Sequence, residues 1–318
     1  MKNQIKLIDI KSSGDFEEFW KKREEYLFRD IFPNDTIGTQ IDEEQRVWLL
    51  SEEYKNHVDR LSNRQVDRLH LVFFEQDGAR IGFCTYCTYF SEDGKCFIIN
   101  FCIYPEFRGQ GFGKQCFNAL AEKQYELGAN YFELNVSNEN NKRFWSSVGF
   151  GYNGYYEYGA MLCQFPPRQY SEFKCELFNE EDFWQLSRLS NGYKAEIGEG
   201  FLGDEQKEAL KKAIEDEDIH FFMVKHKSRV VAMCSVSVTF STFKCERSGV
   251  FEDFYIEPVY RKKGIATKLI NFVYKWCEGK KVSSLWVGCT DSDVEMYKSL
   301  GFKIPLGNLL TWSNEQGE

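Results

Sequence analysis

Two short segments of this 318-residue chain place an arginine and closely spaced small residues directly before a predicted helix. The first segment is Arg108-Gly109-Gln110-Gly111-Phe112-Gly113, and the second, 153 positions later, is Arg261-Lys262-Lys263-Gly264-Ile265-Ala266. Glycine lets the backbone approach a ligand, and the first amides of a helix have no intrahelical acceptor, so such a turn can bind a diphosphate. A glycine pattern alone indicates only a tight turn, but its recurrence favours the diphosphate interpretation.

Two common phosphate-binding classes do not match these segments. Neither segment is closed by the Gly-Lys-Ser/Thr of a Walker loop. The strands that precede the first loop are expected to be antiparallel, because the turn Gln76-Asp77-Gly78-Ala79 links two of them as a hairpin. A nicotinamide-binding fold would instead need parallel strands with helical crossovers.

The elements that must position the loops also occur twice. Before the first loop, apolar runs predict strands at 69–75, 80–88 and 96–104; after it we expect a helix to Leu127, a strand at 131–137 and a helix at 138–148. The second copy predicts strands at 219–225, 229–239 and 249–256, a helix at 264–277, a strand at 283–289 and a helix at 291–300. A helical segment at about 15–66 precedes the first copy and is expected to wall a cleft. The repeat is domain-sized, which excludes a solenoid.

Composition limits the remaining interpretations. Pro166-Pro167 indicates a linker at 166–171 between domains at 1–165 and 172–318. Forty basic against 49 acidic residues give a net charge of −9, so nucleic acid is not an expected partner. No apolar run approaches the roughly 20 residues of a membrane span, and the start lacks a secretion signal, so we expect a cytoplasmic protein without a membrane partner. Most cysteines stand singly in apolar runs, as Cys84 and Cys289 do, and are predicted to be buried; no metal site is expected.

At these residues the chain resembles the GNAT N-acetyltransferase superfamily, twice over. Both loops resemble the family's Arg/Gln-x-x-Gly-x-Gly/Ala motif, and the segments from Asn138 to Phe150 and from Thr290 to Phe302 approach its Asn-x-x-Ala-x-x-Phe-Tyr-x-x-x-Gly-Phe pattern. The resemblance implies an α+β fold class: two tandem acyl-CoA N-acyltransferase folds, each a mainly antiparallel mixed sheet flanked by helices. It also implies acetyl-CoA as cofactor, with its diphosphate on the loop amides and its pantetheine along the preceding strand.

The resemblance assigns cofactor-binding residues in both copies. In the first they are Phe101, Cys102, Ile103, Arg108, Gly109, Gln110, Gly111, Phe112, Gly113, Lys114 and Asn138. In the second they are Phe254, Tyr255, Ile256, Arg261, Lys262, Lys263, Gly264, Ile265, Ala266, Thr267 and Thr290.

The two copies differ in the residues that could transfer protons. An amine must lose a proton before it attacks a thioester, and the departing thiolate leaves more easily if an acid protonates it. The family's usual acid, a tyrosine in the last helix, corresponds to Tyr297, whereas the first copy has Trp145 there. Glu252 and Asp253 precede the second loop and could accept a proton; strand alternation puts them on opposite faces, so only one is expected to line the cleft. We therefore expect the chemistry in the second copy.

Several interpretations stay open. The main one is acetyl transfer to a primary amine of a small molecule or a peptide. A non-catalytic acyl-CoA-binding or sensing protein is the alternative, and a peptidyl or aminoacyl transferase is disfavoured because the GNAT-like domains of such enzymes lack this complete loop. Tyr297 could also be a packing residue, and the two carboxylates could be solvated edge charges. The sequence does not specify the acceptor or the oligomeric state.

Overall fold

The computed structural model describes residues 5–33, 41–155, 160–242 and 245–307. The chain folds into two compact units, described separately below. Unit 1 comprises residues 1–172 with 194–201 and 227–229, and unit 2 comprises the remainder.

Unit 1 is built on a seven-stranded sheet in the order β1-β2-β3-β4-β5-β7-β6. Its strands are β1 (Lys6–Asp9), β2 (Leu69–Gln76), β3 (Ala79–Tyr89), β4 (Lys95–Ile103), β5 (Tyr131–Asn135), β6 (Gly151–Tyr155) and β7 (Met161–Phe165). Neighbouring strands are antiparallel, except that β4 and β5 run parallel.

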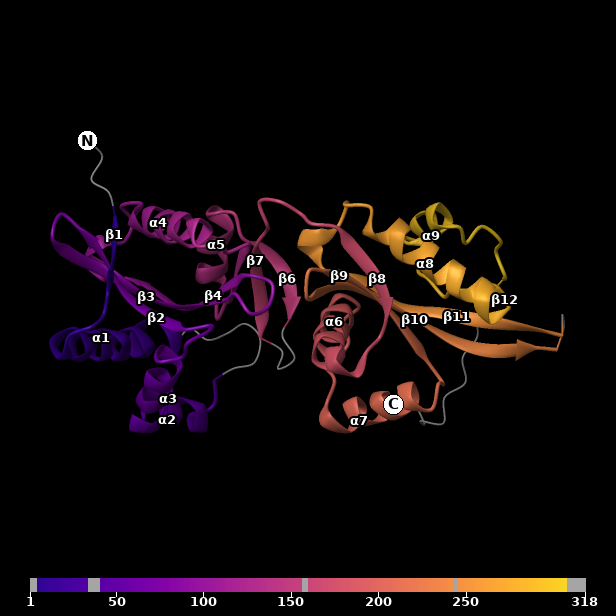
Figure 1. Ribbon diagram of the computed structural model, residues 1–318, viewed down its shortest axis with the longest axis horizontal. Coiled ribbons are helices and arrows are strands. Elements are labelled where there is room, and N and C mark those ends of the chain that lie inside the picture. The colour runs from indigo at the N-terminus through magenta and orange to yellow at the C-terminus, as the bar shows by residue number, and fades with distance from the viewer. Residues whose placement is uncertain (1–4, 34–40, 156–159, 243–244, 308–318) are drawn as a thin grey trace. The chain divides into compact units, whose positions relative to one another are not determined.

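Helices cover both faces of this sheet (Figure 1). One face carries α4 (Phe112–Glu126) and α5 (Glu139–Ser147). The other carries α1 (Ser13–Tyr26), which continues into the π-helical turn η1 (Leu27–Ile31), followed by α2 (Glu43–Leu50) and α3 (Glu52–Ser62). Each face has its own buried cluster, one around Phe117 of α4 and the other around Phe19 of α1. The sheet is therefore apolar on both sides and held rigidly between two helical layers.

Unit 2 repeats the central part of this arrangement. Its five-stranded sheet has the order β12-β11-β10-β9-β8, with β8 (Phe173–Leu177), β9 (His220–His226), β10 (Arg229–Ser241), β11 (Glu246–Ile256) and β12 (Val282–Trp286). The helices are α6 (Phe183–Glu196), α7 (Asp204–Glu215), α8 (Ile265–Lys280) and α9 (Val294–Leu300). Along α8 the buried residues recur at helical spacing, namely Ile265, Leu269, Ile270, Val273 and Cys277, so that one face of the helix packs on the sheet.

The predicted fold class is confirmed: both units are mainly antiparallel mixed sheets flanked by helices. The prediction fails in detail after α8. The strand expected at 283–289 ends at Trp286, and the helix expected from 291 begins at Val294. Cys289, expected to be buried, is exposed because it lies in the irregular segment between them.

Within the described ranges, no helix is long and apolar enough to cross a membrane. The same residues contain no group of three His, Cys, Asp or Glu side chains that could hold a metal ion, and Cys84 and Cys87 are both buried free thiols.

Candidate functional site

The two glycine loops have the same local structure. In unit 1 the Arg108 Nε donates to the carbonyl oxygen of Ile103 at 2.8 Å, and in unit 2 the Arg261 Nε donates to that of Ile256 at 2.9 Å. Each arginine thus closes its loop against the last residue of the preceding strand. The loop arginine therefore has a structural role in shaping the turn, in addition to its charge.

The backbone of each loop is left-handed at two positions. Gly109 and Gly111 have φ of 73° and 82°, and Lys262 and Gly264 have φ of 61° and 76°. The second left-handed residue is the N-cap of α4 or α8, and it offers no side-chain cap to the first amides of the helix. These amides, at the positive end of a helix of 15 or 16 residues, are suited to an anionic ligand.

A gap between two parallel strands opens next to each loop. In unit 1, β4 pairs with β5 only over residues 95–97; in unit 2, β11 pairs with β12 only over 247–250. Beyond these points, in the described part of the chain, the edges at 98–103 and 251–256 have no strand partner on that side. The segments expected to pair with pantetheine lie on these open edges, where backbone groups can bond to an extended ligand.

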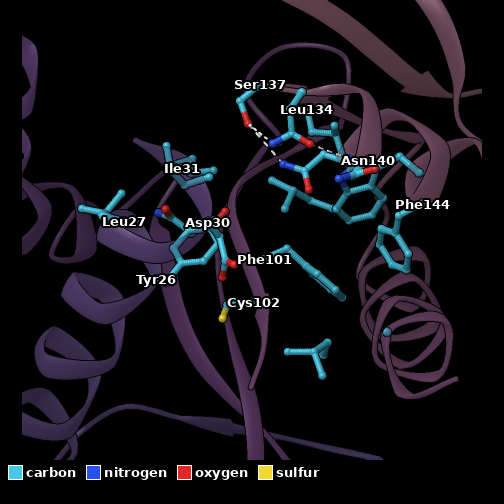
Figure 2. A pocket seen from close by; sticks show the side chains of 18 of the residues that line it. Tyr26, Leu27, Asp30, Ile31, Phe101, Cys102, Leu134, Ser137, Asn140 and Phe144 are labelled. Carbon is cyan, nitrogen blue, oxygen red and sulfur yellow. Dashed lines mark hydrogen bonds between the residues drawn. The ribbon is translucent and has the colours of Figure 1, made fainter. Parts of the chain in front are cut away.

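In unit 1 this gap is part of a cavity of about 840 Å³. Figure 2 shows Tyr26, Leu27, Asp30 and Ile31 on one side, Ser137, Asn140 and Phe144 on the other, and Phe101 and Cys102 of β4 between them. The expectation that the early helices wall a cleft is confirmed for this unit. Of the cofactor residues assigned by resemblance, the cavity is lined by Phe101, Cys102, Ile103, Arg108, Gly109, Gly111, Gly113, Lys114 and Asn138, whereas Gln110 and Phe112 are not part of its wall.

Gly113 shows why a small residue is needed at the end of the motif. A Cβ at this position would lie 2.9 Å from Cε2 of Phe144. The ring of Phe144 lines the cavity, so a larger side chain would push it toward the ligand space.

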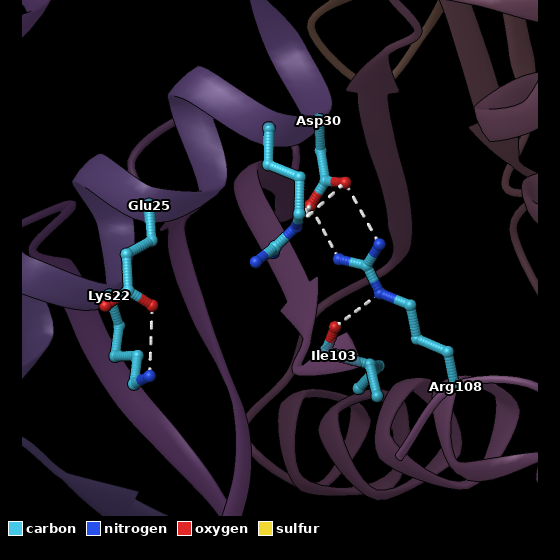
Figure 3. A network of polar contacts seen from close by, with 6 residues as sticks. Lys22, Glu25, Asp30, Ile103 and Arg108 are labelled. Atoms are coloured by element: carbon cyan, nitrogen blue, oxygen red, sulfur yellow. Dashed lines mark hydrogen bonds and ion pairs between the residues drawn. The ribbon is translucent and has the colours of Figure 1, made fainter. Parts of the chain in front are cut away.

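The sequence did not indicate a carboxylate that binds the first loop. Arg108 donates from Nη1 and Nη2 to the two Asp30 oxygens at 3.0 and 2.6 Å (Figure 3). Arg29 also donates to Asp30, at 2.8 Å from Nη2. Burial alone would raise the pKa of Asp30, but the hydrogen bonds from Arg108 and Arg29 outweigh it and hold the pKa below its ordinary value. Asp30 is therefore ionised at neutral pH and ties η1 to the loop.

Asn138 and Thr290, expected to be equivalent, differ in structure. Asn138 is the N-cap of α5, and its Oδ1 accepts from the Asn141 amide at 2.9 Å. Thr290 is exposed, and its Oγ1 donates to Asp293 at 2.7 Å. Asp293, rather than Thr290, is the N-cap of α9, which has only seven residues.

Two of the cofactor residues assigned in the second copy can contribute only backbone groups. Tyr255 and Ile265 are buried, at 3% and 2% exposure, and a Cβ on Gly192 of α6 would lie 2.6 Å from the Tyr255 hydroxyl. The side chains of Arg261, Lys262, Lys263 and Thr267 are exposed, and those of Phe254, Ile256 and Ala266 are partly buried.

Trp145 and Tyr297 occupy corresponding places in the two units. The Trp145 ring lies 5.0 Å from Phe101 on β4 and 4.9 Å from Phe150. The Tyr297 ring lies 6.3 Å from Phe254 on β11 and 5.8 Å from Phe302. The predicted alignment of the two helices therefore matches the packing.

Tyr297 differs from Trp145 in chemistry and exposure. Trp145 is buried in the core of unit 1, whereas Tyr297 is only partly buried. Burial, followed by the nearby Tyr193 and Asp293, raises the pKa of Tyr297 to about 12. The phenol is thus protonated at neutral pH and can donate a proton or a hydrogen bond.

The alternation expected for Glu252 and Asp253 is wrong. The register between β10 and β11 is irregular here, and Asp253 has a φ of 54°, so the strand bulges at this point. The Asp253 carboxylate accepts from the Ser235 hydroxyl at 2.6 Å. Glu252 is exposed, and its pKa is raised by partial burial and by the charge of Asp253.

Tyr193 of α6 is a further residue that the sequence did not indicate. Its pKa is raised by burial and then by the charges of Asp253, Glu252 and Asp293, so all three carboxylates lie near its phenol. Both predicted carboxylates therefore act on Tyr193, which in turn influences Tyr297. The groups that influence the Tyr297 phenol electrostatically are Tyr193, Asp293, Cys289 and Cys234.

Comparison with known proteins places the chain among acetyltransferases. Residues 16–150 and 181–302 each match the Acetyltransferase (GNAT) family. No curated protein matches the chain.

The chain is also similar to solved structures of acetyltransferases, each over less than half of its length. Glucosamine-6-phosphate N-acetyltransferase from Arabidopsis thaliana is 16% identical, with 45% of this chain and 99% of that chain covered and a TM-score of 0.39. A predicted acetyltransferase with acetyl-CoA from Clostridium acetobutylicum is also 16% identical, with 44% and 96% covered and a TM-score of 0.39. An aminoglycoside acetyltransferase from an uncultured soil metagenomic sample, in complex with sisomicin, is 15% identical, with 44% and 95% covered and a TM-score of 0.40.

The two family matches together span most of the chain, and each contains one glycine loop and one gap between parallel strands. The chain belongs to the acetyltransferase (GNAT) family, and it contains two copies of the family's domain.

Proposed function

We propose that this protein is an acetyl-CoA-dependent N-acetyltransferase that acts on a primary amine of a small molecule or a peptide, with its chemistry in unit 2. The observation that carries the proposal is the position of Tyr297, a protonated phenol packed against Phe254 on the open edge of β11. In unit 1 the corresponding side chain is an indole, which is not a useful acid.

The residues of both units suit coenzyme A. The uncapped amides at the start of α4 and α8 can donate hydrogen bonds to its diphosphate, and the open edges of β4 and β11 can pair with pantetheine. Bound there, acetyl-CoA would supply an activated acetyl group as a thioester. We infer that unit 1 holds the cofactor in its 840 Å³ cavity without turnover.

In unit 2 we assign separate tasks to three side chains. Glu252 accepts the amine proton, directly or through water, because its raised pKa makes it a better base than an ordinary glutamate. Asp253, held by Ser235, supports that raised pKa by its negative charge. Tyr297 donates to the departing thiolate, since its phenol keeps its proton at neutral pH.

The first test is release of the CoA thiol from acetyl-CoA in the presence of a panel of polyamines, aminoglycosides and amino acids. Steady release with at least one amine supports an enzyme. If CoA binds but no amine in a broad panel produces turnover, the alternative of an acyl-CoA-binding or sensing protein replaces this proposal.

The second test locates the cofactor. Calorimetric titration with CoA is expected to give two sites per chain, and Gly111→Trp and Gly264→Trp are each expected to remove one. In both cases no atom lies within 4 Å of the added Cβ, so the new side chain does not clash with the core. Both positions are left-handed, with φ of 82° and 76°, so each variant is strained and its melting temperature is compared with that of the wild type. Only Gly264→Trp is expected to abolish turnover; loss of turnover in Gly111→Trp alone would move the chemistry to unit 1.

A further inference from the structure

Arg23 of α1 is a buried cation in the wall of the unit 1 cavity. Its side chain is only 4% exposed and lines the cavity together with Leu49 and Tyr54, away from the glycine loop in sequence. The Arg23 Nη1 donates to the Leu49 carbonyl oxygen at 2.9 Å, and its Cζ lies 4.2 Å from the centre of the Tyr54 ring. These contacts fix the guanidinium in place without neutralising it.

No carboxylate of the described residues pairs with Arg23. Burial lowers its pKa, and the favourable interactions that oppose this effect come from Tyr54 and Tyr26 rather than from an acid. An uncompensated buried charge is costly, and proteins normally supply a partner for it. The described part of the cavity wall contains one acid, Asp30, and that carboxylate is already bound by Arg108 and Arg29.

Unit 2 contains a comparable buried arginine, and that arginine has a carboxylate partner. Arg188 lies in α6, which follows the first strand of unit 2 as α1 follows that of unit 1. Arg188 is 2% exposed and forms an ion pair with Glu257, which is fully buried, and it also donates to the Val230 carbonyl oxygen at 2.7 Å. The Nε atoms of both arginines have no hydrogen-bond partner, so the difference between them is the carboxylate.

The geometry of Arg23 leaves one edge of its guanidinium for a ligand. Nη1 is occupied by the Leu49 carbonyl, and Nε has neither an acceptor among the described residues nor accessible surface, so Nη2 is the donor that a ligand can reach. A charged Nη2 donor suits an oxygen of a carboxylate, because a hydrogen bond between ionised groups is stronger than one between neutral groups. Tyr26, another residue of the cavity wall, is influenced by the charges of both Arg23 and Arg108.

We infer that the Arg23 end of the unit 1 cavity binds a carboxylate group of a ligand that fills the cavity. The carboxylate has two possible sources: the far end of a dicarboxylic acyl group carried by CoA, or a separate small carboxylic acid bound beside CoA. In both cases Arg23 supplies the charge and the Nη2 donor, and the Tyr54 ring packs against the guanidinium. The first source rests on the proposed binding of CoA by unit 1, and the second does not require that unit 1 catalyses anything.

The test is calorimetric titration of the full chain carrying Gly264→Trp, so that binding reports on unit 1. One arm compares succinyl-CoA, whose acyl group ends in a carboxylate, with butyryl-CoA, whose acyl group ends in a methyl group. The other arm titrates succinate in the presence of CoA. We expect the carboxylate to improve binding by about ten- to a hundredfold, the usual range for a hydrogen bond to a charged group. A preference in the first arm identifies an acyl-CoA ligand, and succinate binding in the second identifies a separate acid.

The effect must depend on Arg23. Arg23→Met should abolish the preference while butyryl-CoA still binds, which shows that the cavity is intact. Lys22→Met is the matched control, because Lys22 is the adjacent cation on α1 and pairs with Glu25 at 3.0 Å on the surface; it should leave the preference unchanged. If Arg23→Met fails to fold, Arg23→Lys, which keeps the charge but not the guanidinium that reaches the cavity wall, should retain only part of the preference. The inference is overturned if wild-type unit 1 shows no carboxylate preference in either arm, or if Arg23→Met keeps it.

Discussion

Both carboxylate oxygens of Asp30 accept hydrogen bonds from the guanidinium of Arg108, whose Nε also donates to the carbonyl oxygen of Ile103. The pair joins the π-helical turn η1 to the glycine loop (Figure 3), and both residues line the unit 1 cavity. The wall that the early helices form and the loop that faces the cofactor are thus one connected structure. Disturbing Asp30 should therefore affect both stability and ligand binding.

Replacing Asp30 by Asn should lower the melting temperature at neutral pH. Half-exposed ion pairs contribute up to about 1 kcal/mol, so a shift of about 2–4 °C is expected for a protein of this size. The pKa of Asp30 is lowered in the folded protein, so its contribution is full above about pH 4, the pKa of an unfolded aspartate, and is lost as pH falls through the folded value. Scanning calorimetry of both proteins between pH 3 and 7 should show the difference shrinking in acid. A constant difference would mean that the charge of Asp30 is unimportant.

Tyr297→Phe should lower kcat by roughly 10²–10⁴ fold at saturating amine, the range typical of a general acid. Because the pKa of Tyr297 is raised to about 12, the loss should be uniform between pH 6 and 9. Tyr274→Phe is the control, since its hydroxyl donates to the Leu300 carbonyl oxygen at 2.9 Å in the same unit and has no assigned chemistry. That variant should lose stability but keep kcat within a few-fold. An unchanged kcat in Tyr297→Phe would remove the acid from the mechanism.

The charge of Asp253 should be visible in the pH dependence of kcat/KM. Glu252 must be ionised to accept a proton, and its pKa is raised by burial and by Asp253, so activity should fall in acid with a midpoint above 4.5. Asp253→Asn removes the neighbouring negative charge and should move this midpoint down. Comparing the two profiles with the same amine cancels the titration of the amine itself. An unchanged midpoint would show that Glu252 is not the catalytic base.

The buried pair of Arg188 and Glu257 should matter far more to stability than any surface pair of unit 2. Glu257→Gln leaves the fully buried guanidinium without its carboxylate, which should cost about 3–5 kcal/mol, or roughly 10 °C in melting temperature. The double variant Arg188→Met/Glu257→Met should recover most of the loss. Glu295→Gln, which breaks the exposed pair with Lys298, is the control and should change little.

The sequence was a good guide wherever a pattern repeats locally. The loops, the hairpin strands around them and the helix α8 follow from turn residues and helical spacing, and the structure confirms these elements. The correspondence of Trp145 with Tyr297 also follows from counting along two similar segments, because their aromatic neighbours recur with them.

What the sequence could not predict depends on contacts between distant segments. Asp30 meets Arg108 across 78 positions, and no local pattern distinguishes it from other surface acids. The bulge at Asp253 breaks strand alternation, and alternation was the only basis for placing Glu252 and Asp253 on opposite faces. Tyr193 reaches the Tyr297 group from α6, a helix whose sequence carries no family motif.

The exposed thiol of Cys289 complicates the most common way of assaying this chemistry. Colorimetric reagents that report free CoA react with any accessible sulfhydryl, and here Cys245 and Cys289 are exposed whereas eight of the eleven cysteines are buried. Cys289 influences Tyr297 electrostatically, so modification of this thiol is expected to disturb the environment of the proposed acid. A thiol-reactive dye that is present throughout turnover should therefore inactivate the enzyme while it detects the released CoA. The variant Cys289→Ser should instead give linear progress curves.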